Sequence, residues 1–183
     1  KYRGLGVSAC ATCDGFFYRK KTVAVVGGGD TACEEATYLA GICKKVYMIV
    51  RRDVLRASEA MQERVRNTEN IEVLWNCNTQ EVLGDEYGVT GARLVRKDGE
   101  VFDIAVDGFF LAIGHHPNSD LFKEWIEVDK EGYIVTDGKT SKTNVPGVFA
   151  AGDVQDPLYR QAITAAASGC RAALDAEKFL KML

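Results

Sequence analysis

The sequence is poor in histidine, and its few histidines are not placed to form a structural zinc site. Such a site usually needs two separated pairs of cysteine or histidine ligands. The two histidines, His115 and His116, are adjacent, and only Cys10 and Cys13 of the six cysteines lie close together. We therefore expect no bound metal. The other cysteines are scattered singly: Cys33, Cys43, Cys77 and Cys170.

The chain also lacks an excess of positive charge and a long apolar run. Its 23 Lys and Arg against 26 Asp and Glu give a net charge of −3, which argues against nucleic acid or an anionic membrane as a partner. No apolar run approaches the ~20 residues of a membrane span, and residues 1–4 hold no apolar core of a signal peptide. Cysteines without a disulfide pattern suit a reducing compartment, so we expect a cytoplasmic protein.

Two residues separate Cys10 from Cys13, and Asp14 follows the pair directly. Thiols at this spacing can close and reopen a disulfide, because the neighbouring sulfur and backbone N–H groups favour the reactive thiolate. An adjacent carboxyl can supply or accept the proton of each half-cycle. The pattern predicts a redox-active dithiol with Asp14 as its acid–base group. Half of a zinc site and a static structural disulfide are the alternatives.

A glycine-rich turn follows the dithiol and precedes an expected helix at 31–39. The β-branched run at 22–26 is typical of a buried parallel strand. Gly27, Gly29 and Ala32 then match G-x-G-x-x-A, in which small residues make the tight turn, admit a pyrophosphate and let the helix pack on the strand. The helix N-terminus favours phosphate. The motif predicts a dinucleotide site at Gly27, Gly28, Gly29, Asp30 and Thr31.

Arginines stand where the nucleotide specificity of such a site is decided. After the next expected strand, 45–50, an NAD site usually carries an acid for the ribose 2′-hydroxyl. This chain has Arg51 and Arg52 there and Arg56 one turn later. Guanidinium groups suit a phosphate, so the pattern favours NADP(H). The alternative is a solvated cluster of surface charges.

The remaining sequence predicts a small antiparallel sheet and then a second domain. Apolar runs at 71–75, 79–83, 89–95 and 101–106 alternate with turns, and Lys97-Asp98-Gly99-Glu100 reads as a hairpin. The run 108–114 returns to the parallel sheet, and His115-His116-Pro117-Asn118 marks a domain boundary. Beyond it we expect a short strand at 148–153 and one alanine-rich helix at 158–180.

Taken together, these motifs closely resemble the bacterial-type, low-molecular-weight NADPH-dependent thioredoxin reductases. The resemblance covers all 183 residues. Its motifs are Cys-Ala-Thr-Cys-Asp-Gly at 10–15, Gly-Gly-Gly-Asp at 27–30, Arg-Arg-Asp at 51–53, Ala-Ile-Gly-His at 112–115, Gly-Val-Phe-Ala-Ala-Gly-Asp-Val at 147–154 and Tyr-Arg-Gln-Ala at 159–162.

The resemblance implies an α/β fold in which a Rossmann-like, three-layer NADPH-binding domain with a small antiparallel sheet spans 1–115. The C-terminal part of an FAD-binding domain would span 116–183. Further cofactor-binding residues implied in this way are Ile113 and Gly114 for NADPH, and Gly152, Asp153, Arg160, Gln161 and Ala162 for FAD.

The resemblance also implies an activity. Electrons would pass from NADPH through FAD to a Cys10–Cys13 disulfide and on to thioredoxin, in a protein that is a homodimer at full length. Cys13 would attack thioredoxin, Cys10 would resolve, and Asp14 would move the proton.

Two departures from the family pattern stand out. The family's own FAD glycine motif, which would precede Lys1, is absent, so we expect either a fragment or isolated domain, or an N-terminal half on a separate chain. Val50 stands where relatives often carry histidine. Two rival functions follow: an NADP(H)-binding module that is inactive without its FAD half, and a flavoprotein reductase of a peroxiredoxin system.

Overall fold

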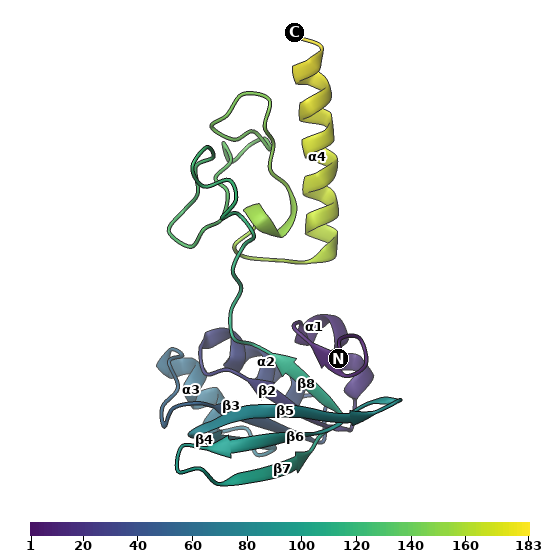
Figure 1. Ribbon diagram of the computed structural model, residues 1–183, viewed down its shortest axis with the longest axis vertical. Helices are drawn as coiled ribbons and strands as arrows, with labels where there is room; N and C mark the ends of the chain where they lie inside the picture. Colours follow the sequence, from purple (N-terminus) through teal and green to yellow (C-terminus); the bar gives the residue numbers. More distant parts are fainter. The chain divides into compact units, whose positions relative to one another are not determined.

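The computed structural model describes residues 1–183, which divide into two compact units, Lys1–Gly114 and His115–Leu183 (Figure 1). The sequence placed the domain boundary one residue later, between 115 and 116. No helix in the chain combines the length and the apolar character that a membrane span requires.

The first unit is built on a five-stranded parallel sheet in the order β1-β8-β2-β3-β4. β2 lies at its centre, where Val25 pairs with Met48 of β3 on one side and with Phe110 of β8 on the other. Its buried β-branched run suits a strand with neighbours on both sides. The strands are β1 (Val7–Ser8), β2 (Thr22–Val26), β3 (Lys45–Val50), β4 (Ile71–Trp75) and β8 (Gly108–Leu111).

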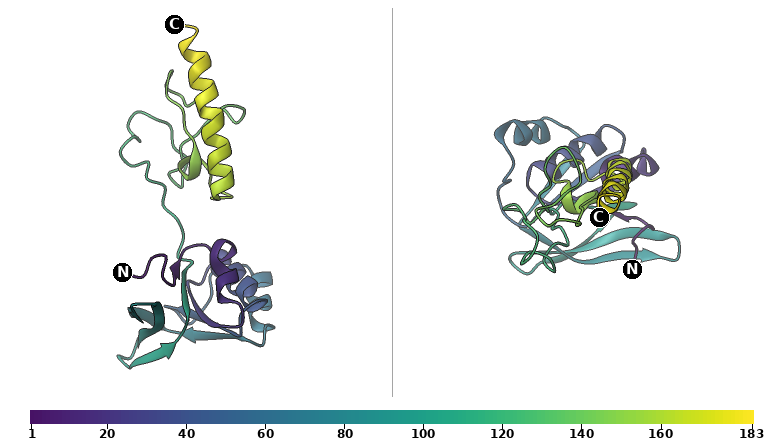
Figure 2. Two further views of the ribbon diagram at one scale, coloured as in Figure 1. Left: turned by 90° about the vertical axis from the view of Figure 1, so that its right-hand side faces the viewer. Right: turned by 90° about the horizontal axis from the view of Figure 1, so that it is seen from above.

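Different layers cover the two faces of this sheet (Figures 1 and 2). One face carries α1 (Ala11–Asp14), the 3₁₀ turn η1 (Gly15–Tyr18), α2 (Asp30–Ala40) and α3 (Glu59–Arg66). The other carries an antiparallel sheet of β5 (Cys77–Asp85), β6 (Gly88–Arg96) and β7 (Val101–Ala105). This arrangement confirms the predicted three-layer α/β fold with its small antiparallel sheet.

The alternation of side chains along the strands separates two hydrophobic cores. Val23, Val25 and Phe110 pack toward the helices, while Ala24 and Phe109 pack toward the antiparallel sheet. Successive residues of a strand face opposite sides of a sheet. The apolar β2 run therefore contributes side chains to both cores. A shift of its register by one residue would turn each of these side chains toward the opposite face of the sheet.

The second unit, 115–183, is mostly irregular chain packed beside one long helix. It contains the 3₁₀ turn η2 (Gly152–Gln155) and α4 (Ala162–Leu180). Buried Asp175 of α4 accepts hydrogen bonds from the backbone N–H and the hydroxyl of Ser141, at 2.9 and 2.8 Å. Phe149 and Phe179 pack edge to face. These contacts fasten the irregular segment to the helix.

Several predicted elements differ from the structure. Residues 71–75 form β4 of the parallel sheet rather than part of the antiparallel one. α3 was not predicted, since five of its eight residues are charged or polar. The run at 148–153 forms no strand; Phe149 makes only an isolated bridge with Lys142.

The predicted helix at 158–180 begins only at Ala162. The Asp156 carboxylate accepts the backbone N–H groups of the three residues 158–160, and Arg160 has a φ of 47°. A carboxylate that binds the following N–H groups stabilises a loop in place of a helix, so the first four residues of the expected helix form a turn.

Phe110 offers a test of the helix-side core. It is fully buried, and its ring meets that of Tyr18 edge-on at 5.4 Å between centroids. Phe110→Ala should lower the free energy of unfolding by about 3–5 kcal/mol, because it leaves a cavity. The matched control is Phe16→Ala, whose side chain is 68% exposed and which should change stability by less than about 0.5 kcal/mol. Denaturant unfolding followed by circular dichroism measures both, and equal losses would contradict the assignment.

Asp175 predicts an acid-dependent stability. The Ser141 N–H and hydroxyl hold its pKa below the ordinary 3.8. Because the folded-state pKa is the lower one, the stabilisation is present above about pH 4 and is lost as the pH falls through the folded value. Asp175→Asn keeps an acceptor oxygen but does not titrate. The difference in thermal midpoint between the natural chain and Asp175→Asn should therefore be clear near pH 7 and should close as the pH falls through the folded pKa of Asp175. A difference in thermal midpoint that does not change with pH would contradict this prediction. An equal pH-dependent difference for the exposed control Glu177→Gln would contradict it as well.

Candidate functional site

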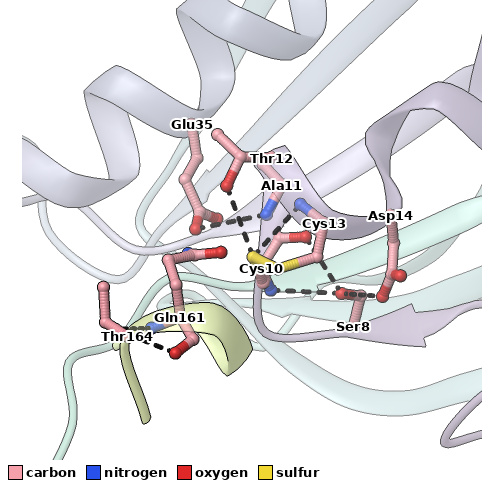
Figure 3. The surroundings of a disulfide bond; sticks show 9 residues. All are labelled: Ser8, Cys10, Ala11, Thr12, Cys13, Asp14, Glu35, Gln161 and Thr164. Atoms are coloured by element: carbon pink, nitrogen blue, oxygen red, sulfur yellow. Dashed lines mark hydrogen bonds between the residues drawn. A yellow bond between two sulfur atoms is a disulfide. The ribbon is translucent and has the colours of Figure 1, made fainter. Parts of the chain in front are cut away.

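Cys10 and Cys13 form a disulfide at the start of α1, with their Cα atoms 5.3 Å apart (Figure 3). Cys10 is the N-cap residue of α1, and its Sγ accepts the N–H of Cys13 at 3.1 Å. The Thr12 hydroxyl lies 3.4 Å from the same sulfur. The predicted pairing is therefore present. A helix start with donors directed at one sulfur would favour a thiolate there once the bond is reduced.

The Asp14 carboxylate is held beside the disulfide by Ser8. The Ser8 hydroxyl donates to Asp14 Oδ2 at 2.6 Å, and the Cys10 N–H donates to Ser8 Oγ at 3.1 Å (Figure 3). Ser8 thus links the carboxylate to the backbone of the first cysteine. Asp14 is marked in the sequence by its position beside the cysteines, whereas Ser8 lies on β1 and carries no motif of its own.

A second carboxyl, Glu35 of α2, lies against the same turn (Figure 3). Its Oε1 accepts the Ala11 N–H at 3.4 Å, while its Oε2 is buried without a hydrogen-bond partner. Burial raises the pKa of Glu35, and the Ala11 N–H opposes this only in part. Nothing in the sequence marked Glu35, because a glutamate in an amphipathic helix ordinarily faces solvent.

The glycine turn after β2 is required by close backbone packing. Gly27 has a φ of 147°, and a Cβ there would lie 2.3 Å from the carbonyl oxygen of Ala112. Gly29, the N-cap residue of α2, faces open space, with no atom within 4 Å of a Cβ built on it. At Gly27 the turn therefore packs against the backbone that follows β8, and at Gly29 it leaves room for a ligand.

A cavity of about 710 Å³ opens at this turn. All ten residues that the sequence assigned to NADPH line it: Gly27, Gly28, Gly29, Asp30, Thr31, Arg51, Arg52, Arg56, Ile113 and Gly114. Eight further residues line the cavity and were not predicted, among them Cys77, Asn78 and Thr79. These three stand at the start of β5, a position that no local motif marks.

Positive charge at the cavity comes from three arginines in the segment 51–58, between β3 and α3. The segment is tied to the glycine turn, because the Arg56 N–H donates to the Gly28 carbonyl at 2.6 Å. Asp30 accepts from both the N–H and the hydroxyl of Ser58, and these bonds lower the pKa of Asp30. The cavity thus joins a helix N-terminus to a cationic rim, a combination suited to a phosphorylated ligand.

The residues assigned to FAD lie in the second unit, between η2 and the start of α4. Gly152 has a φ of 74°, and its N–H donates to the buried Ser168 hydroxyl at 2.8 Å. Arg160 donates to the Tyr133 hydroxyl at 3.1 Å and to the Pro157 carbonyl at 2.6 Å. Asp153 lies in η2, Gln161 is the N-cap residue of α4, and Ala162 is its first residue. The structure therefore gathers these five residues at one end of the long helix.

Comparison with known proteins matches this geometry to one family. A family profile described as "Pyridine nucleotide-disulphide oxidoreductase" matches residues 1–169. The thioredoxin reductase of Coxiella burnetii is 53% identical over 190 residues, which cover 100% of this chain and 59% of that protein. The glucosaminate ammonia-lyase of Pseudomonas fluorescens is 54% identical over 186 residues, covering 98% and 58%.

A solved structure gives the same result. The thioredoxin reductase of Streptococcus pyogenes matches 97% of this chain and 58% of its own, with 38% identity and a TM-score of 0.90. The chain thus spans little more than half the length of the relatives it matches, and the resemblance to thioredoxin reductases is confirmed. By sequence and by fold, the chain belongs to the pyridine nucleotide-disulphide oxidoreductases.

Proposed function

We propose that this chain is the NADPH-binding and dithiol-bearing part of a thioredoxin reductase. The observation that carries the proposal is the Cys10–Cys13 disulfide on the same unit as the glycine-turn cavity with its three arginines. The names of the Coxiella and Streptococcus relatives support the same activity.

NADPH would bind in the cavity at the glycine turn. The N-terminus of α2 would face the pyrophosphate, with Gly29 and Thr31 at the point of closest approach. Arg51, Arg52 and Arg56 would bind the 2′-phosphate through their guanidinium groups. Gly28 and the Ile113–Gly114 segment would line the rest of the site. An open face at Gly29 and a cationic rim are what this ligand requires.

The second unit fits a flavin nucleotide. Gly152 leaves room beside the backbone, with only the Ala165 Cβ within 4.0 Å of a Cβ built there, and the exposed Asp153 carboxylate could accept a ligand hydroxyl. The N-terminus of the 19-residue helix α4 lies at the same end. We assign Gly152, Asp153, Arg160, Gln161 and Ala162 to FAD. When bound, FAD would take a hydride from NADPH and pass the electron pair to the disulfide.

The dithiol would then carry out disulfide exchange. Two electrons break the Cys10–Cys13 bond, and two protons complete the thiols. The Cys13 thiolate attacks the disulfide of thioredoxin to form a mixed disulfide, and one thioredoxin sulfur leaves. Cys10, whose thiolate the Cys13 N–H would favour, next attacks Cys13 Sγ, which restores the protein disulfide and releases thioredoxin with both its sulfurs reduced. Asp14, held by Ser8, would supply and take up the proton.

Three further assignments belong to the proposal. Thioredoxin is the protein partner, the full-length protein is a homodimer, and its compartment is the cytoplasm. The four free cysteines support a reducing compartment. The exposed apolar side chains of α4, among them Ile163, Leu174 and Leu180, suit a helix that packs against further protein.

The arginines predict a preference for NADP(H) over NAD(H). Replacing both Arg51 and Arg52 with alanine should remove about 2–3 kcal/mol of that preference, because two charge-assisted contacts are lost. Calorimetric titration with the two nucleotides measures it. Arg64→Ala is the matched control, because Arg64 lies on α3 away from the cavity and should leave the preference unchanged. Equal affinity of the unmutated chain for both nucleotides would refute the proposed specificity.

The roles of the two cysteines can be separated without flavin. The chain, chemically reduced and freed of reductant, should pass electrons to oxidised thioredoxin. Cys13→Ser should abolish this transfer, whereas Cys10→Ser should accumulate a mixed disulfide through Cys13, because no resolving thiol remains. Thiol labelling and mass spectrometry follow both products. The control is Cys170→Ser, which removes an exposed free cysteine on α4 and should transfer normally. Transfer by Cys13→Ser at the unmutated rate would show that the pair does not serve thioredoxin.

A further inference from the structure

Apart from local bonds to α3, which follows it, the segment 51–58, which we call the arginine loop, is fastened to its surroundings at three points. The Arg52 carbonyl accepts the N–H of Asn76 at 3.1 Å, and the Arg56 N–H donates to the Gly28 carbonyl at 2.6 Å. Ser58 makes the third attachment, donating its N–H and its hydroxyl to Asp30 Oδ1 at 2.9 and 2.8 Å. Of these three attachments only the third involves side chains, those of Asp30 and Ser58, so it is the one that substitution can remove.

The position of Asp30 is unexpected for a residue that binds the nucleotide directly. It is the first residue of α2 and lines the cavity where the phosphates would lie. A carboxylate at a helix N-terminus is favourable to the helix, but it would repel a phosphate placed beside it. One of its oxygens is already taken by two donors of Ser58. Those bonds favour the ionised form, since they lower the pKa of Asp30.

We propose that Asp30 is a positioning residue that selects for the 2′-phosphate by holding the arginine loop, rather than a ligand of the nucleotide. Through Ser58 it fixes the C-terminal end of the loop against the start of α2, so that Arg51, Arg52 and Arg56 meet the phosphate in one arrangement. This inference rests on the proposed NADPH site. It differs from the sequence-based assignment, in which Asp30 belongs to the residues that contact the cofactor.

The test compares 2′,5′-ADP with 5′-AMP, because the two ligands differ only in the 2′-phosphate. Titration calorimetry on the 183-residue chain gives the ratio of the two affinities. Because 2′,5′-ADP is the more negatively charged ligand, loss of the Asp30 charge alone would raise this ratio, so a fall in the ratio reports lost positioning. Asp30→Ala should lower this ratio by about 3- to 10-fold, the effect of losing about one net hydrogen bond. Ser58→Ala should lower it less, because the Ser58 N–H still donates. Asp30→Asn, which keeps an acceptor oxygen, should restore most of it.

A double variant and a control complete the design. Ser58→Ala added to Asp30→Ala should have no further effect on the ratio, since the two residues share one contact. Glu34→Ala removes the same charge from an exposed position on α2 and should leave the ratio unchanged. Circular dichroism checks that each variant is folded.

Three results would overturn the inference. An unchanged ratio in Asp30→Ala would mean that the loop is held without Asp30, while the proposed specificity would stand. A further loss in the double variant would mean that Asp30 and Ser58 act separately. An unmutated chain that binds 2′,5′-ADP no better than 5′-AMP would overturn both this inference and the proposed NADPH site.

Discussion

The parallel pairing of β2 with β3 and β8 is the constraint on which the candidate nucleotide site depends. In that register Val26 lies beside Ile49 and Leu111. The carboxyl ends of all three strands therefore meet at one edge, as ligand sites of open α/β sheets require. The glycine turn, the arginine loop and the Ile113–Gly114 segment each follow one of these strands, so three stretches far apart in sequence line one cavity.

The same sheet also positions the dithiol. β1 pairs with the far side of β8, and its Ser8 holds Asp14 while α1 follows within a few residues. From α2, the helix that begins at the glycine turn, Glu35 reaches the amide of Ala11. α2 thus contacts both candidate sites of the first unit. Its N-terminus lines the cavity, and Glu35, just over one turn later, contacts the disulfide turn.

Most of this fold could be predicted from the sequence, because its strands are apolar runs bounded by turns and its motifs are local. β2 and β3 were predicted at their observed bounds, and the disulfide followed from two cysteines at close spacing. What escaped prediction depends on contacts between distant residues. Ser8 and Glu35 meet the dithiol turn only after folding, and Thr79 reaches the cavity from the second sheet. The start of α4 was misplaced because the turn at Asp156 competes with helical hydrogen bonds.

The three free cysteines of the first unit bear on the side reactions that are open to the Cys10–Cys13 pair. Cys33, Cys43 and Cys77 are all buried, and burial raises the pKa of Cys33 and of Cys43 to about 11. At neutral pH only ~1 in 10⁴ of such thiols is ionised, and the thiolate is the form that exchanges with disulfides. If the Cys10–Cys13 pair exchanges as proposed, these buried thiols would compete with it only slowly. Correct pairing of the proposed redox cysteines would thus depend in part on the hydrophobic core, which keeps the other thiols protonated.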